Sequence, residues 1–267
     1  LWSPGSSMLD ISYILAGAFT GFVVGLTGVG GGALMMPILL LFGVNPVTAV
    51  ATDLWFAVLT KLAAVAIHSR ADQVDWAVVR RLWTGSLPMA LIIVLLVSAG
   101  ARVQKVDWLG QAIAVVVLLT AVGMLLAPWL RARAARRRIG RPQPFLRWQP
   151  ALTRLAGALL GLCVALTSVG AGALGSVMLM YLYPLRMTPH RLVATDIMHA
   201  IPLALVAGLG YLFAGQVDWV MLLNLLAGSI PAVIAGSLLS RRLNGRWLQI
   251  ALALVLLVAG LKTLSTL

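Results

Sequence analysis

The chain has 267 residues, of which 61% are hydrophobic and 10% are charged, and its formal net charge is +13. Soluble domains are usually about 45–50% apolar and about 25% charged, so this composition excludes an ordinary soluble enzyme or nucleic-acid-binding domain. We therefore predict an all-α polytopic membrane protein, which has the lipid bilayer as its surroundings and no nucleic acid among its partners.

Ten apolar runs follow one another along the chain. Spanning a hydrocarbon core of about 30 Å takes about 20 helical residues. The second run of each half has eleven residues, which rise only about 16 Å as a helix. We predict that these two runs cross partway or start from a turn that lies below the membrane surface. The runs are 11–28, 33–43, 51–68, 78–98, 109–127, 151–169, 173–183, 193–214, 220–240 and 247–265.

The runs form two groups that are separated by a basic stretch. Residues 1–7 precede Met8 and are interpreted as a tag or cloning remnant. Residues 8–127 form a first membrane repeat, 128–150 an Arg-rich linker, and 151–267 a second membrane repeat. Because positively charged residues mark the cytoplasmic side of membrane proteins, we expect the linker to be cytoplasmic.

The two groups repeat each other in sequence. The segment GAFTGFVVGLTGVGGGAL from Gly17 aligns without gaps on GALLGLCVALTSVGAGAL from Gly157, and VATD, QVDW and GSLP/GSIP then match at one constant offset. With five crossings per half, 16 Lys and Arg lie inside and two lie outside, whereas four crossings give 11 against 7. The charge distribution therefore favours two inverted repeats of about five helices each.

Asp53 and Asp196 are the two acids that fall within apolar runs, at equivalent positions of the two repeats. Charges inside membrane segments usually serve a function, so we predict a role in the transport site. The alternative is that each aspartate caps its helix behind a turn. Asp75 and Asp218 each precede a Trp at a helix start, which is typical of a capping residue beside an interfacial aromatic.

Lys61 lies about mid-span, and its counterpart in the second repeat is Ala204. A salt bridge to Asp53 or Asp196 and a contact with an anionic substrate are both open interpretations. His199 follows Asp196 by three residues and shares its helix face, so it could relay protons or donate to a substrate. The predicted coupling or gating residues are Thr52, Asp53, Thr195, Asp196 and His199.

A glycine-rich break precedes the short run of each repeat. Glycine lets the backbone turn sharply and lets a ligand approach closely. The helix that follows presents free N–H groups and the positive end of its dipole, which together favour an anion. Close helix packing through small residues is the alternative interpretation. The predicted substrate-binding residues are Thr27, Gly30, Gly31, Gly32, Lys61, Thr167, Gly170 and Gly172.

These motifs resemble the TauE/SafE family of sulfite exporters. The resemblance runs from about Tyr13 to Leu264, and is carried by TGVGGGALMMPILLLFGVNP, VATDLWFAVLTKLAAVAIH, the VDW elements and VATDIMHAIPLALVAGLGYLFAGQVDW. It implies transport of sulfite, a sulfonate such as sulfoacetate, or a related small anion. The second glycine motif departs from the first, with Ser168 and Ala171 in place of Gly28 and Gly31. This leaves open whether both halves bind substrate equally.

We thus predict an exporter of a small organosulfur anion in a bacterial inner membrane, without a cofactor or metal, and compatible with a homodimer. An anion channel, a permease for small carboxylates and an intramembrane enzyme that uses Asp53 and Asp196 are the alternatives. No Ser/His/Asp set or metal-ligand set accompanies these acids in the sequence, so an enzyme is not expected.

Overall fold

The computed structural model describes eight helices, and their positions follow the apolar runs. It describes residues 10–27, 35–68, 73–101, 143–170, 172–183 and 186–239, with scattered positions between 111 and 133 and between 254 and 261. The helices are α1 (Ile11–Thr27), α2 (Met35–Leu41), α3 (Pro46–His68), α4 (Trp76–Ala101), α6 (Gln143–Thr167), α7 (Ala173–Leu182), α8 (Pro189–Phe213) and α9 (Trp219–Leu239). No strand occurs in the part of the chain that the structure describes. The helix α6 begins within the predicted linker, at Gln143.

Five of these helices are long and apolar enough to cross a membrane, so the chain is an all-α polytopic membrane protein. They are the helices α3, α4, α6, α8 and α9, and α1 adds a shorter apolar segment at Ile11–Gly25. The helices α2 and α7 have 7 and 10 residues. At 1.5 Å per residue these described helices rise only about 10 and about 15 Å, which is less than a hydrocarbon core of about 30 Å.

The helix α1 packs against α9, which belongs to the other half of the chain. A Cβ atom added at Gly17 would overlap the backbone of Leu225, and one added at Gly21 would overlap the backbone of Ser229. Small residues on one face let two backbones approach this closely in a membrane. The two contacts advance together along both helices, so α1 and α9 run in parallel.

The helices α4 and α6 also come from different halves of the chain, and they pack against each other in the same way as α9 and α1. A Cβ atom at Gly157 would overlap the backbone of Leu82, and one at Gly161 would overlap that of Ser86. In the aligned repeats these positions correspond to those of the α1–α9 crossing. The first helix of each half therefore packs against the fourth helix of the other half.

The helices α3 and α8 lie between these two pairs. The helix α3 packs against α9 and α8, and α8 packs in turn against α4. The helices thus pack in the order α1, α9, α3, α8, α4, α6. This order is symmetric, because replacing each helix by its equivalent in the other half reverses it. Apolar residues of both halves, such as Leu54, Phe56, Leu203 and Leu225, share one buried core.

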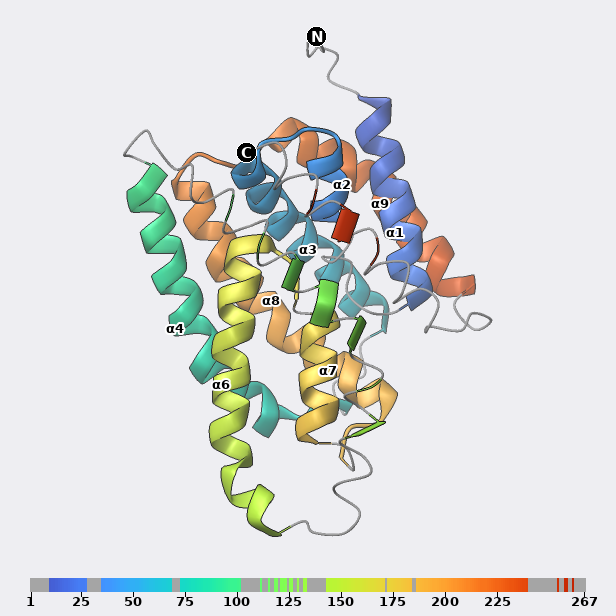
Figure 1. The fold of residues 1–267 in the computed structure, drawn as a ribbon. Helices are drawn as coiled ribbons and strands as arrows, with labels where there is room; N and C mark the ends of the chain where they lie inside the picture. The colour runs from blue at the N-terminus through green and yellow to red at the C-terminus, as the bar shows by residue number, and fades with distance from the viewer. Residues whose placement is uncertain are drawn as a thin grey trace.

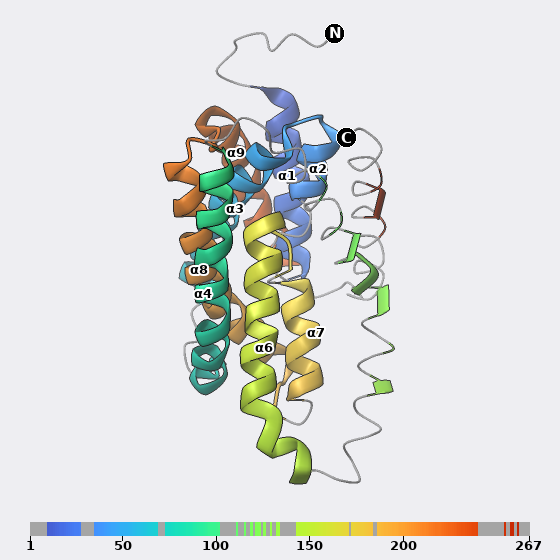
Figure 2. The same ribbon diagram turned by 60° about the vertical axis from the view of Figure 1, so that its left-hand side comes forward.

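Equivalent helices point in opposite directions. Figure 1 shows α1 descending from the N-terminus, whereas its counterpart α6 begins at the bottom and ends near the top. Figure 2 shows α4 and α6 ascending side by side. These directions support the inverted-repeat arrangement. Its orientation in a membrane stays a prediction.

Candidate functional site

The two VATD motifs lie at the same depth in the central helices. Asp53 in α3 and Asp196 in α8 lie about two turns past the starts of their helices, at Pro46 and Pro189. Asp53 is fully buried and Asp196 is 4% exposed. The helix α8 is capped by Thr188, whose side chain accepts from the Arg191 N–H. The alternative that these aspartates cap their helices is therefore wrong.

The aspartates of the VDW motifs are the capping residues, as predicted. Asp75 Oδ1 accepts a hydrogen bond from the Val78 N–H at 3.4 Å, and Asp218 Oδ1 accepts one from the Met221 N–H at 2.9 Å. Each carboxylate thus satisfies a donor that the first turn of α4 or α9 leaves free.

The threonines of the VATD motifs hold the VDW turns of the opposite half. Thr195 Oγ1 accepts from the Asp75 N–H at 3.0 Å, and Thr52 Oγ1 accepts from the Asp218 N–H at 3.3 Å. The sequence marked Thr52 and Thr195 as candidates but did not pair them with these turns. Each hydrogen bond places a helix start of one half beside a buried carboxylate of the other.

Asp53 has unusual surroundings for a buried carboxylate. Neither of its oxygens has a hydrogen-bond partner among the described residues. The polar groups that lie near this carboxylate are the Ser168 hydroxyl, the Met36 backbone and the Lys61 amine. Ser168 and Met36 do not meet the geometry of a hydrogen bond to it. Ser168 belongs to the second half of the chain, so the site around Asp53 combines both halves.

Lys61 is 4% exposed and has both aspartates as electrostatic neighbours. Among the described residues it makes no ion pair with Asp53 or Asp196 within 4.0 Å. The salt bridge that the sequence suggested is therefore not a direct contact in this structure. The lysine instead supplies a positive charge to a centre that holds two carboxylates.

Asp196 faces the first turn of α7. A Cβ atom added at Gly175 would overlap Asp196 Oδ1, so the absence of a side chain there makes room for the carboxylate. This oxygen also lacks a hydrogen-bond partner among the described residues. The sequence gave Gly175 no role, because a single glycine inside an apolar run has many explanations.

His199 is fully buried, and Ser86 of α4 contacts its ring. Ser86 Oγ lies 2.9 Å from His199 Nε2, and the Trp83 indole N–H donates to the His199 carbonyl at 3.3 Å. His199 Nδ1 has no partner in the described part of the chain. Sequence reasoning missed Ser86, although the repeated Gly-Ser pair of the GSLP and GSIP motifs was a usable signal.

The second glycine break forms a tight turn between α6 and α7. Ser168 has φ 56° and Gly170 has φ 124°, and a side chain at Gly170 would be strained. Thr167 Oγ1 donates to the Cys163 carbonyl at 2.7 Å and accepts from the Val169 N–H at 3.1 Å, so it stabilises the turn. The Ser168 hydroxyl has no partner among the described residues.

The other predicted substrate-binding residues lie in different parts of the fold or outside its described residues. Gly172 is the N-cap residue of α7. Thr27 is the last residue of α1. Gly30, Gly31 and Gly32 lie outside the described residues. The structure thus places one glycine turn beside the central helices, and the equivalence of the first turn stays a prediction.

Taken together, α3 and α8 bring one lysine, two carboxylates and one imidazole into the same buried region. These groups can balance the charge of a small anion or exchange protons with each other. Among the described residues no three His, Cys, Asp or Glu side chains gather as metal ligands would.

Comparison with known proteins gives matches along almost the whole chain. The family model described as "Sulfite exporter TauE/SafE" matches residues 13–263. The "Probable membrane transporter protein YjnA" of Bacillus subtilis (strain 168) is 39% identical over 264 residues, covering 95% of this chain and 99% of that protein. The "Probable membrane transporter protein YunE" of the same organism is 39% identical over 275 residues, covering 95% and 96%. No solved structure gives a significant match.

Proposed function

Because this chain belongs to the sulfite exporter TauE/SafE family of membrane transporters, we propose that it exports sulfite, a sulfonate such as sulfoacetate, or a related small organosulfur anion. The observation that carries the proposal is the buried centre between α3 and α8. There Lys61 and the carboxylates Asp53 and Asp196 lack direct hydrogen bonds or ion pairs with one another. Buried charges that are not paired directly with one another suit a site whose partner is the cargo.

The substrate site would lie where the two halves meet. Lys61 would attract the oxyanion, and the turn around Gly170 would bring backbone N–H groups and the Ser168 hydroxyl toward it. The first glycine turn, with Thr27 and Gly30 to Gly32, would complete the site from the other half. This role for both turns rests on their sequence equivalence.

The buried carboxylates require an explanation in a site for anions, because like charges repel. At least one of Asp53 and Asp196 would be protonated when the substrate binds, or neutralised by Lys61. Thr52 and Thr195 would transmit movement of α3 and α8 to the helix starts that they hold. His199, hydrogen-bonded to Ser86, would accept or release a proton at Nδ1.

Export of an anion needs no obligatory coupling to protons. A negative cell interior favours outward movement by about 2.3 kcal/mol per charge for each 100 mV. A uniporter with two inverted repeats would therefore suffice. The chain would lie in the bacterial inner membrane with the 128–150 linker in the cytoplasm, as the positive-inside rule favours.

Flux into liposomes tests the substrate class. Purified protein would be reconstituted and offered sulfite, thiosulfate, sulfoacetate and small carboxylates, with protein-free liposomes as the control. We expect saturable flux of an organosulfur anion. Saturable flux of carboxylates alone would reassign the cargo, and fast flux without saturation would identify a channel.

Cysteine labelling tests the topology. In a variant with Cys163 replaced, cysteines at positions 138 and 242 should react from the cytoplasmic side, and those at 104 and 216 from the outside. Reaction of 138 and 242 from opposite sides would refute the inverted arrangement of five crossings per half.

A further inference from the structure

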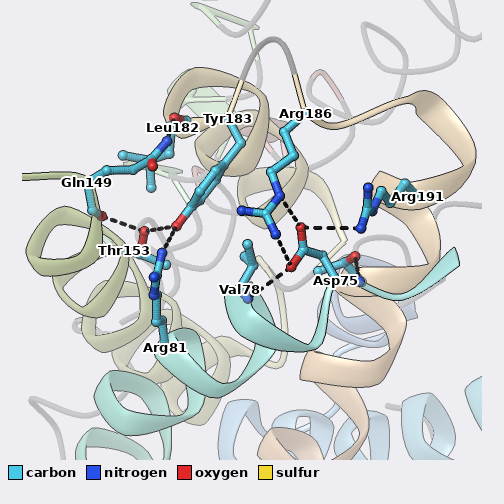
Figure 3. Close-up of polar contacts among 10 residues, drawn as sticks. Asp75, Val78, Arg81, Gln149, Thr153, Leu182, Tyr183, Arg186 and Arg191 are labelled. Carbon is cyan, nitrogen blue, oxygen red and sulfur yellow. Dashed lines mark hydrogen bonds and ion pairs between the residues drawn. The ribbon is translucent and has the colours of Figure 1, made fainter. Parts of the chain in front are cut away.

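Two arginines converge on one buried carboxylate where α4 and α8 begin, as Figure 3 shows. Arg186 Nε lies 2.7 Å from Asp75 Oδ2, and Arg186 Nη2 donates to Asp75 Oδ1 at 3.2 Å. Arg191 Nη2 lies 3.7 Å from Asp75 Oδ2. The carboxylate belongs to the first half of the chain and both arginines belong to the second.

This cluster has more positive charge than its carboxylate can balance. The side chains of Arg186 and Arg191 are 49% and 40% exposed, whereas that of Asp75 is 2% exposed. The Arg191 Nε atom is buried and has no hydrogen-bond partner among the described residues. The exposed parts of both guanidinium groups are therefore open to anions from solution.

The equivalent cluster at the other end of the molecule lacks arginine. Asp218 corresponds to Asp75, and it caps α9 and bonds to Thr52 in the same way. In the aligned repeats Gly43 and Thr48 take the places of Arg186 and Arg191. In the described part of the chain no cation lies within 4.0 Å of Asp218. The duplicated backbone arrangement thus needs no arginine to form.

We propose that Arg186 and Arg191 form a recruitment site for the substrate oxyanion, and that Asp75 is a tethered competitor for it. Guanidinium groups bind oxyanions through paired hydrogen bonds, and a carboxylate and a sulfite or sulfonate group offer similar oxygen acceptors. An arriving anion would bind the two guanidinium groups in place of the Asp75 carboxylate, which would then be released. The inference deepens the proposed function and rests on it.

Release of Asp75 would affect the centre of the protein through one hydrogen bond. The Asp75 N–H is bonded to Thr195, and Thr195 directly precedes Asp196 in α8. Freeing the carboxylate removes its ion pairs with Arg186 and Arg191. Among the described residues, the hydrogen bond to Thr195 then still joins the Asp75 turn to α8. Recruitment of an anion would thereby loosen the end of the bundle through which the anion must enter.

A neighbouring arginine offers a matched control. Arg81 of α4 donates to the Tyr183 hydroxyl at 3.3 Å, and Tyr183 lies 2.8 Å from the Thr153 hydroxyl (Figure 3). Arg81→Gln removes a positive charge from the same end without touching Asp75. Asp218→Asn is the control for loss of a capping carboxylate.

The experiment measures the KM for sulfite offered from the arginine side of oriented liposomes. Arg186→Gln and Arg191→Gln should each raise this KM about tenfold, since hydrogen bonds to charged groups contribute this much to affinity. Asp75→Asn should lower it, because the competitor is gone. Arg81→Gln and Asp218→Asn should change it by less than about twofold on the same scale.

Several results would overturn the proposal. An Arg81→Gln effect equal to that of Arg186→Gln would assign the change to general surface charge. An unchanged KM in folded Asp75→Asn would make the cluster a static ion pair. If Asp75→Asn does not fold, the two arginine variants and Arg81→Gln still decide. A KM change that appears only with anionic lipid would assign the arginines to lipid headgroups.

Failure of the proposed function is distinguishable from failure of this inference. If wild-type protein shows no flux of sulfite, thiosulfate or sulfoacetate, the export function fails. Sulfite binding by the detergent-purified variants then tests the recruitment site directly, with stronger binding expected for Asp75→Asn and weaker binding for Arg186→Gln. Equal binding by all variants would refute the site.

Discussion

Asp75 and Asp218 occupy equivalent positions at opposite ends of the helix bundle, where α4 and α9 begin (Figure 1). Each carboxylate caps the helix that follows it, and each backbone N–H bonds to a threonine of the other half. Asp75 in addition holds two arginines, which have no counterpart around Asp218 among the described residues. The duplication has kept the interactions that position the backbone and has changed the charges that surround it.

The same contrast holds at the centre. Asp53 and Asp196 are duplicated, but Lys61 corresponds to Ala204 and His199 corresponds to Phe56. The two halves therefore share a scaffold and differ in the polar groups that face the buried region.

The largest effect should follow from filling either glycine crossing. Gly21→Leu and Gly161→Leu each place a side chain against the backbone of a neighbouring helix, so each should destabilise the fold by about 3 kcal/mol or more. Folded yield and Tm in detergent measure the effect. Leu15→Phe at a 63% exposed position is the control. Tolerance of one glycine variant and loss of the other would break the equivalence of the two crossings.

The central charges should show coupled effects on transport. Lys61→Ala leaves two buried carboxylates without their cation, so its flux should be lower than that of the double variant Lys61→Ala/Asp53→Asn. Coupling energies between interacting residues are about 0.5–3 kcal/mol, which sets the expected size. Flux and its pH profile in single and double variants provide the measurement. Strictly additive effects would show that Lys61 and Asp53 act independently.

A smaller and symmetric effect is expected at the two threonines. Thr52→Val and Thr195→Val each remove the acceptor for one N–H of a capping turn, so each should cost about 1 kcal/mol of stability. Thermal unfolding of both variants gives the comparison. A much greater loss in Thr195→Val would show that the arginine-bearing end depends on its threonine more than the other end does.

The smallest effect separates Ser86 from its counterpart Ser229. Ser86→Ala removes the hydrogen bond to His199 and should cost about 1 kcal/mol. Ser229 Oγ has no partner among the described residues, so Ser229→Ala should leave the Tm unchanged or raise it slightly. Equal losses in both variants would contradict the assigned asymmetry.

The sequence by itself determined where the helices lie. Apolar runs such as 51–68 and 173–183 became α3 and α7 within a few residues, because burial of apolar side chains in lipid is a property of each segment alone. The repeat also identified Asp53 and Asp196 as equivalent buried acids, since the offset between them could be read directly. The capping roles of Asp75 and Asp218 followed from their places at helix starts.

The tertiary structure decided which helices and side chains meet. The crossing of α1 with α9, the bond of Thr195 to Asp75 and the approach of Arg186 to Asp75 join residues more than 100 positions apart. Helix propensity and hydropathy are local properties and contain no information about such partners. The same reason explains why the sequence left helix capping open as the alternative role of Asp53, since only the start of α3 at Pro46 places the carboxylate inside the helix.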